Sequence, residues 1–254
     1  MKNFLFLAAF LLCICFACKE EADDFVPDFG FDYYPLSVGE VRHFEVDTVY
    51  FSTANPRFDT VYSQLREVIT GTLLNNTGDT IYRVEHSERK TSDDAFEITD
   101  IYSEELNNFN IYRTEENLRF LKLPLPPTVN KTWDGNAEIA DDRTVSVAGE
   151  SLEMFKSWEY RILSKGETEE INGKTYEDVL TVQLADSDSE IEYRYGVEKY
   201  ARGTGLIYRE LWILDTQCKG CCDAPDGTIP LECTELPWEL RADEGFIMRQ
   251  FRTE

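Results

Sequence analysis

Alternation of apolar and polar residues with a period of two is the feature that most restricts how this chain of 254 residues folds. Between residues 42 and 50, one face carries Arg42-Phe44-Val46-Thr48-Tyr50 and the other carries His43-Glu45-Asp47. Such alternation, with many β-branched and aromatic side chains, is typical of β-strands. Similar stretches cover residues 59–74, 79–90, 108–113, 117–123, 157–164, 174–185, 190–201, 205–215 and 245–252.

Short segments rich in turn-forming residues separate these strands. Asn172-Gly173 and Arg202-Gly203-Thr204-Gly205 each lie between two strand-like runs, as do residues 75–78 and 114–117. Tight reversals of this kind join neighbouring antiparallel strands. The sequence therefore predicts an all-β fold, an antiparallel meander that forms a strongly curved sheet or a partly closed barrel. Residues 149–156 are compatible with either a short helix or a loop.

Length and charge limit the classes of function. Residues 33–254 are enough for one sizeable core, so we expect a single β-rich domain there. The formal net charge of −24 excludes a nucleic-acid binder, because phosphates require a basic surface. The same charge opposes adsorption of the protein surface to an anionic membrane.

The first residues have the layout of a secretory signal. Met1-Lys2-Asn3 is positive, residues 4–16 are apolar, and the small Ala17 precedes Cys18. The apolar run is shorter than the roughly 20 residues that a spanning helix needs. Residues 1–17 are therefore predicted to be a signal peptide. Cys18 resembles the cysteine that bacterial lipoproteins acylate, which implies a membrane anchor through acyl chains such as palmitate; ordinary cleavage without a lipid is the alternative.

The segment after Cys18 is acidic and leads into the domain. Residues 18–32 mix charge, proline and glycine, which is typical of a tether. Lys19-Glu20-Glu21 resembles the export signal of Bacteroidota surface lipoproteins. That resemblance implies an outer-membrane lipoprotein displayed at the cell surface; without it, the protein would remain on the periplasmic face.

Four further segments resemble an uncharacterised family of Bacteroidota lipoproteins. They are residues 32–39 with a "YxPLxVG" opening, residues 123–137, residues 171–182, and residues 200–211 with a "GxGLIY" hairpin. The resemblance covers most of the mature chain and implies a location and a β-rich fold, but no activity. Within it, Pro35 and Gly39 are expected to set a turn before the first strand, and Gly203 and Gly205 to allow positive φ in a hairpin.

A cysteine-rich loop occupies residues 218–233. Cys218, Cys221, Cys222 and Cys233 are even in number, and an exported chain meets an oxidising compartment, so two disulfides are predicted. A bridge between the adjacent Cys221 and Cys222 is the least favoured of the three pairings because of ring strain. Four thiolates binding zinc remain an alternative.

No motif in the sequence indicates catalysis. The Gly203-Thr204-Gly205 segment lacks the lysine of a phosphate-binding loop and is read as a hairpin. His43 and His86 lie in strand-like stretches without a nucleophile motif, so both are read as polar strand positions. Residues 186–190 lack the glycine and the closing glutamate of a calcium loop and are read as a solvated turn. No cofactor and no metal is therefore expected.

Three Asp-Thr-aliphatic triplets recur along the chain. Thr48, Thr60 and Thr80 follow an aspartate in triplets that resemble the O-glycosylation acceptor of exported Bacteroidota proteins. Strand propensity alone also produces such triplets. The four tryptophans are expected in core or interface packing: Trp133, Trp158, Trp212 and Trp238.

Two functional classes follow. In the first, a lipid-anchored envelope or cell-surface protein with no identifiable catalytic site binds a ligand or protein partner through its concave sheet or cystine loop. In the second, unidentified carboxylates act in a glycan or lipid hydrolase. An apolar cavity would favour lipid handling within the first class, and a cleft with two facing acids would favour the second.

Overall fold

The computed structural model describes residues 27–52, 55–217 and 231–254. The predicted signal peptide, Cys18, the Lys19-Glu20-Glu21 segment and three of the four loop cysteines, Cys218, Cys221 and Cys222, lie outside these ranges. Cys233 is described and is buried. Lipidation, surface display and the two disulfides therefore stay predictions.

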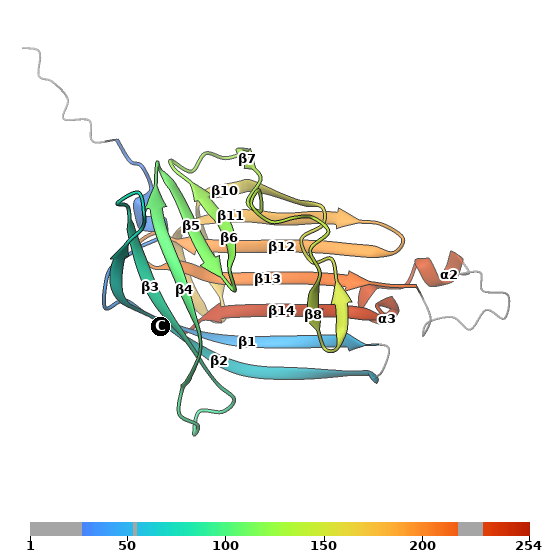
Figure 1. Cartoon of the computed structure of the whole chain (residues 1–254). Coiled ribbons are helices and arrows are strands. Elements are labelled where there is room, and N and C mark those ends of the chain that lie inside the picture. The colour runs from blue at the N-terminus through green and yellow to red at the C-terminus, as the bar shows by residue number, and fades with distance from the viewer. Residues whose placement is uncertain (1–26, 53–54, 218–230) are drawn as a thin grey trace, which may run out of the picture.

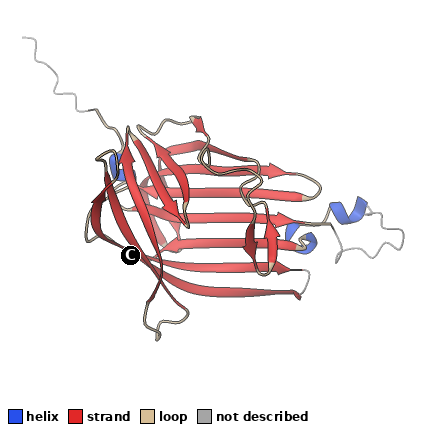
Figure 2. Ribbon diagram, in the orientation of Figure 1, coloured by secondary structure: helices blue, strands red, loops and turns tan. Residues whose placement is uncertain are grey.

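Most of the described chain is β-strand, with each strand in the first half pairing antiparallel to the next (Figures 1 and 2). A 3-10 turn, η1 (Phe31–Tyr33), comes before the first strand. The strands of this half are β1 (Val41–Ser52), β2 (Asn55–Leu74), β3 (Thr80–Arg89), β4 (Glu97–Asn107), β5 (Asn110–Glu115) and β6 (Leu118–Pro124).

The second half adds a further series of antiparallel neighbours. Its strands are β7 (Thr132–Trp133), β10 (Trp158–Ile171), β11 (Lys174–Asp188), β12 (Glu192–Ala201), β13 (Gly205–Asp215) and β14 (Glu244–Arg252). A separate two-stranded hairpin and two short helices complete it: β8 (Val145–Val147), β9 (Glu150–Leu152), α2 (Leu231–Thr234) and α3 (Trp238–Arg241).

The two halves join through β1 and β14, which pair antiparallel with Thr48 opposite Met248. Strand order in the twelve-stranded sheet is β6-β5-β4-β3-β2-β1-β14-β13-β12-β11-β10-β7. The predicted all-β, single-domain fold is confirmed. The sheet consists of two antiparallel meanders, one from each half of the chain. They meet at the β1–β14 pair.

Strong curvature brings the two edges of the sheet together at one corner. The backbone N–H of Leu121 on β6 donates to the carbonyl of Gly135, just after β7, at 2.8 Å. The indole N–H of Trp133 on β7 donates to the Leu121 carbonyl at 2.9 Å. A side chain at position 135 would overlap the Tyr160 ring, so this close approach requires glycine. The sheet is not closed, but β4–β6 arch over the opposite half (Figure 1).

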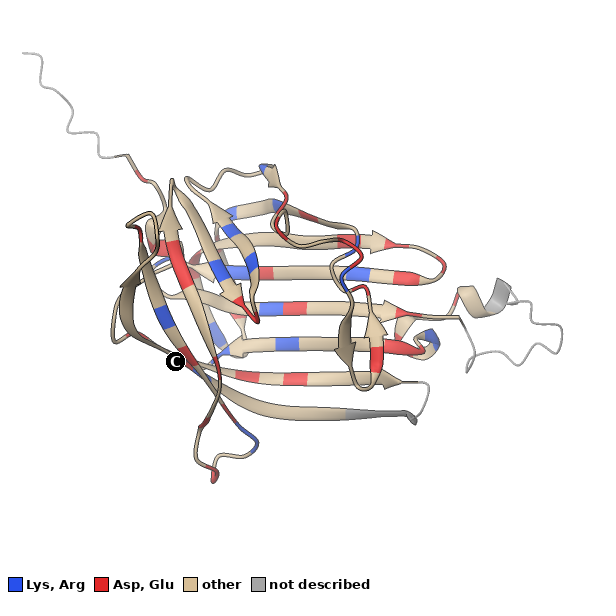
Figure 3. Ribbon diagram, in the orientation of Figure 1, with Lys and Arg blue, Asp and Glu red and all other residues tan. Residues whose placement is uncertain are grey.

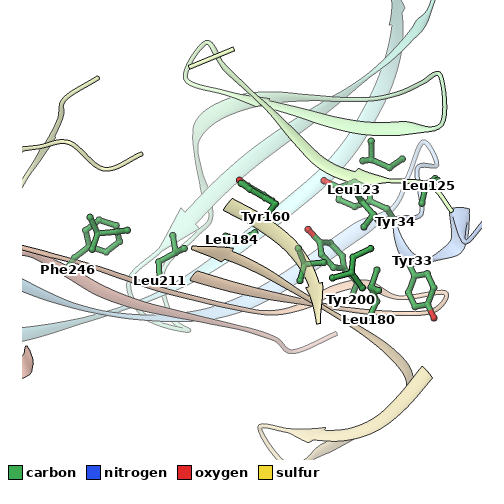
Figure 4. Packing of buried hydrophobic residues seen from close by; sticks show 14 of the residues in the cluster. Tyr33, Tyr34, Leu123, Leu125, Tyr160, Leu180, Leu184, Tyr200, Leu211 and Phe246 are labelled. Atoms are coloured by element: carbon green, nitrogen blue, oxygen red, sulfur yellow. The ribbon is translucent and has the colours of Figure 1, made fainter. Parts of the chain in front are cut away.

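The main core fills the interior of the curved sheet. Tyr34, Tyr160, Tyr200 and Leu211 belong to this cluster (Figure 4). Neighbouring residues of a strand point to opposite faces. Leu214, next to Ile213 of the main core, accordingly belongs to a second cluster with Trp238 of α3. The four tryptophans all pack against a core cluster, as predicted.

The turns agree with the sequence at several positions. Asn172 and Gly173, with φ of 50° and 74°, make the two-residue reversal between β10 and β11. Gly203 in the turn after β12 and Gly205 at the start of β13 have positive φ, and Gly39 has φ of 93° before β1.

Three segments differ from their predictions. Strand β4, residues 97–107, is not among the strands predicted from the sequence. Residues 149–156 are neither a helix nor simply a loop, because 150–152 form β9, and turn residues follow. Of the segment 186–190, residues 186–188 extend β11, so the turn starts only at Ser189.

Candidate functional site

A pocket of about 190 Å³ lies between β6 and the opposing strands β10 to β13. Because β6 belongs to the half that arches over those strands, the pocket is on the inner side of the curved sheet (Figure 1). Its lining comes from both halves of the chain: Glu115, Glu116, Leu118, Phe120, Lys122, Val145, Met154, Phe155, Trp158, Tyr160, Leu184, Glu198, Arg209 and Leu211.

Aromatic side chains make one wall of the pocket. The ring of Phe155 lies 5.7 Å from that of Phe120 and 5.8 Å from that of Trp158, with both distances between centroids. The Trp158 indole N–H donates to the Met154 carbonyl at 2.8 Å, and the Tyr160 hydroxyl donates to Asn136 Oδ1 at 3.1 Å. The polar atoms of these large side chains are thus satisfied, and their apolar faces remain for the pocket.

Charged side chains form a second part of the lining, centred on the fully buried Glu198 of β12. Lys122 Nζ donates to Glu198 Oε1 at 2.6 Å, and Arg209 Nε donates to the same oxygen at 2.7 Å. The Tyr200 hydroxyl donates to Glu198 Oε2 at 2.5 Å. Figure 3 shows basic residues on both halves of the sheet, consistent with this contact between β6, β12 and β13.

Protonation in the pocket follows from these contacts. Burial alone would raise the pKa of the Glu198 carboxyl, but the charges of Lys122 and Arg209 outweigh burial and lower that pKa to about 2. Burial, together with the charge of Arg209, lowers the pKa of Lys122, although Glu198 opposes that effect. The pKa of Glu115 is lowered as well, because Arg113 and Arg209 outweigh its burial.

These pKa directions bear on the hydrolase alternative. A glycosidase general acid needs a carboxyl group with a raised pKa that stays protonated before it donates. Glu115 and Glu198, both in the pocket, have lowered pKa values and are ionised at neutral pH. The pocket therefore does not present a general acid from this pair. Charged residues also line the pocket, so it is not the purely apolar cavity that would favour lipid handling.

A second ionic network lies around the fully buried Glu104 of β4. Glu104 Oε1 accepts from the Tyr34 hydroxyl at 2.7 Å, from Arg42 at 2.9 Å and from Arg113 at 2.7 Å. Arg113 Nη2 also donates to Glu67 at 2.5 Å. The cavity beside this network measures about 10 Å³, too small for a ligand. This network holds β1, β2, β4 and β5 together.

The histidines are on strands, as predicted, but they differ in environment. His43 on β1 is partly exposed and lies 3.3 Å from the Glu254 carboxylate. His86 on β3 is buried, with Nδ1 3.5 Å from Glu67 and Nε2 3.4 Å from Glu88. Burial lowers the pKa of His86, but the two carboxylates outweigh it and raise that pKa to about 9. His86 is therefore a buried cation of this second network.

The predicted glycan acceptors fall into two environments. Thr48 on β1 is only 9% exposed, whereas Thr60 and Thr80 are exposed. Among the described residues, no group of three or more His, Cys, Asp or Glu side chains is arranged to hold a metal ion. Within the same residues, no helix is long and apolar enough to cross a membrane.

Sequence reasoning missed the charged residues of the pocket. It read polar positions in strands as solvent-facing, yet Arg209 is on the same face of β13 as Leu211 and Ile213, which belong to the core. Lys122 likewise lines the pocket together with Leu118 and Phe120 of β6. A charged residue that continues an apolar face was the available signal.

Comparison with known proteins finds no family model and no curated protein that matches the chain. Two solved structures are similar over most of its length. One is described as an exported protein with a YmcC-like fold from Bacteroides fragilis, with 8% identity, 86% of this chain and 96% of that chain covered, and a TM-score of 0.36. The other is described as a lipoprotein from Parabacteroides distasonis, with 11% identity, 87% and 97% covered, and a TM-score of 0.35.

Proposed function

We propose that this protein is a lipid-anchored envelope protein that binds a small amphipathic molecule inside its curved sheet. The observation that carries the binding part is the pocket of about 190 Å³, with an aromatic wall beside Lys122, Glu198 and Arg209. Apolar pockets with a few fixed polar groups are the usual form of small-molecule sites. The volume is below the roughly 300 Å³ typical of drug-sized ligands, so the part of the ligand that is buried is small.

The location rests on the sequence. The junction FACKEEADD supports acylation of Cys18, and Lys19-Glu20-Glu21 supports display on the outer face of the outer membrane. Residues 18–32 would then tether the domain, with a reach of at most about 3.5 Å per residue. The resemblance of residues 32–39 and 200–211 to Bacteroidota lipoproteins supports the same location.

Mass spectrometry of the mature amino terminus tests the anchor. We expect a terminus at Cys18 that carries acyl chains; an unmodified terminus, or one at another residue, contradicts the proposal. Replacing Lys19-Glu20-Glu21 with alanines should leave the protein in the membrane fraction but protect it from protease added to intact cells. Continued cleavage by that protease would show that the triplet does not direct display.

Calorimetric titration with octanoate, 1-octanol and octylamine tests ligand binding. Val145→Trp puts a large ring on a residue that lines the pocket and should remove whatever binding the wild type shows. Ser146→Trp is the matched control, because Ser146 is the next residue of β8, is exposed and is not part of the lining. Absence of binding for all three compounds, or equal binding by both variants, would contradict the proposed function.

A further inference from the structure

We infer that the pocket selects amphipathic molecules with a carboxylate headgroup, which Lys122 and Arg209 bind while the aromatic wall holds the apolar part. This inference rests on the proposed function and names the chemistry of its ligand. Lys122 and Arg209 keep unused hydrogen-bond donors, and the neighbouring Glu115 is hydrogen-bonded to Arg113. Apolar side chains line the pocket beside the two cations.

The carboxylate of Glu198 has little capacity left for a ligand. Its Oε1 accepts from both Lys122 and Arg209, and its Oε2 accepts from Tyr200. The residue is also fully buried. Three of the roughly four acceptor sites of the carboxylate are therefore occupied, so Glu198 serves mainly to fix the two cations in place.

The two cations, in contrast, keep unused donors. An ammonium group has three donor hydrogens and a guanidinium group has five. Within the described residues, the side chain of Lys122 makes one hydrogen bond and that of Arg209 makes one, both to Glu198. Both side chains line the pocket. Hydrogen bonds from such cations to a carboxylate are stronger than those between neutral groups, and a guanidinium matches the two carboxylate oxygens in geometry.

Two further acids, Glu115 and Glu116, line the pocket and would favour a cationic headgroup. Glu115 lies close enough to Arg209 and Lys122 for their charges to lower its pKa. Its hydrogen bond, however, is to Arg113 Nε, which leaves the donors of Lys122 and Arg209 available. Glu116, in the turn between β5 and β6, also lines the pocket. If these two acids determined selection, a cationic headgroup would bind best, which is the opposite of our inference.

The apolar lining suits a short alkyl or aryl group next to that headgroup. Phe120 and Lys122 of β6 both line the pocket, with a register shift between β5 and β6 next to Lys122. Leu211 is two residues after Arg209 on β13, so both side chains are on one face of that strand. Each cation therefore adjoins an apolar residue of its own strand, and a bound molecule with its headgroup at the cations would have its apolar part against Phe120 and Leu211.

The test compares the affinities of octanoate, 1-octanol and octylamine for the wild-type protein at neutral pH. These compounds share one alkyl chain and differ in headgroup charge. We expect octanoate to bind at least about tenfold more tightly than 1-octanol, in line with charged hydrogen bonds in a site of low dielectric constant. We expect octylamine to bind more weakly than 1-octanol. This comparison needs no variant and is unaffected by folding.

The variant Lys122→Gln then tests whether Lys122 binds the carboxylate headgroup. Glutamine can still donate to Glu198, but it has no charge, so octanoate affinity should fall about tenfold while 1-octanol affinity changes less than about threefold. Lys156→Gln is the control with the same change of charge, because Lys156 pairs with Glu192 and is not part of the lining. Near-ultraviolet circular dichroism checks that both variants fold.

The outcomes separate the two proposals. Equal affinity for the three compounds, or tighter binding of octylamine, would overturn carboxylate selection while leaving the pocket as a ligand site. No binding of any compound would remove the proposed function itself. If Lys122→Gln folds and binds octanoate like the wild type, the headgroup is not bound by Lys122, and the inference is wrong for that residue.

Discussion

Lys122 Nζ lies 2.6 Å from Glu198 Oε1 and thereby connects β6 to β12, two strands from opposite halves of the sheet. Both side chains are buried, with exposed fractions of 7% and 0%. Removing one partner of a buried ion pair strongly destabilises the fold, because the other charge stays buried without compensation. The contact between the two halves is therefore sensitive to changes at Glu198.

Glu198→Gln is expected to lower the free energy of unfolding by about 3–5 kcal/mol, because Lys122 and Arg209 both lose their partner charge. Lys122→Met should cost less, since Glu198 keeps Arg209 and Tyr200. Urea denaturation measures both. Glu159→Gln, at an exposed position of β10, is the control and should change stability by less than about 0.5 kcal/mol. If Glu198→Gln lowers the free energy of unfolding no more than Glu159→Gln does, the Lys122–Glu198 pair is not a stabilising contact.

Stability should depend on pH through His86. Its pKa is raised to about 9 in the folded protein, above the ordinary value of 6.5. The groups that face it are Glu67 on β2, Glu88 on its own strand, Arg113 on β5 and the ring of Tyr102 on β4. Because the folded pKa is the higher one, the stabilisation is complete below pH 6.5 and is lost as the pH rises through 9.

We therefore expect His86→Gln to be less stable than the wild type by up to about 3 kcal/mol more at pH 6 than at pH 10. Chemical denaturation at the two pH values measures this difference. His43→Gln is the matched control, since the chain has only two histidines and His43 is partly exposed. If the difference in free energy of unfolding between wild type and His86→Gln is the same at pH 6 and pH 10, His86 does not hold an extra proton in the folded protein.

The loop cysteines are expected to be oxidised in the exported protein. Alkylation without reductant should label none of Cys218, Cys221, Cys222 and Cys233, whereas all four should react after reduction and unfolding. Closing a loop of this length stabilises the protein by about 3 kcal/mol in the chain-entropy model. Full labelling of the unreduced protein would contradict the disulfides, and zinc bound in the purified sample would favour the metal-site alternative.

Glycosylation of the Asp-Thr-aliphatic triplets should follow exposure. A glycan needs an accessible hydroxyl group, so we expect use of Thr60 or Thr80 and no use of the buried Thr48. Intact masses of protein from its native host, for Thr60→Ala, Thr80→Ala and Thr48→Ala, test this. A mass loss beyond the substitution only in Thr48→Ala would contradict the expected order. Mass losses equal to the substitution in all three would show that no glycan is attached.

The local features of the fold could be predicted because they are encoded in neighbouring residues. The strands around Phe44 and the reversal at Asn172-Gly173 follow from side-chain alternation and from glycine conformation. Strand β4 was missed because its exposed apolar residues, Ile98 and Ile101, are three positions apart, and the β3–β4 register shifts beside them. A period of two is lost at such an irregularity.

The site could not be predicted because it depends on contacts across the whole chain. Glu198 and Arg209 face each other across the β12–β13 hairpin, but Lys122 reaches them only after β1 pairs with β14 and the sheet curves. Alternation places Arg209 on the core face of β13, but it does not show which charged partner from β6 it meets there. Local patterns assign a residue to a face, but they do not reveal that two charged residues on distant strands compensate each other inside.

The central pairing of β1 with β14 also means that the sheet is complete only when the two ends of the domain meet. Almost the whole domain lies between these two strands, and contacts so far apart in sequence are slow to form. Until they form, the free edge of β1 can pair with a strand of another chain. A chain truncated before Glu244 would keep that edge without its partner strand.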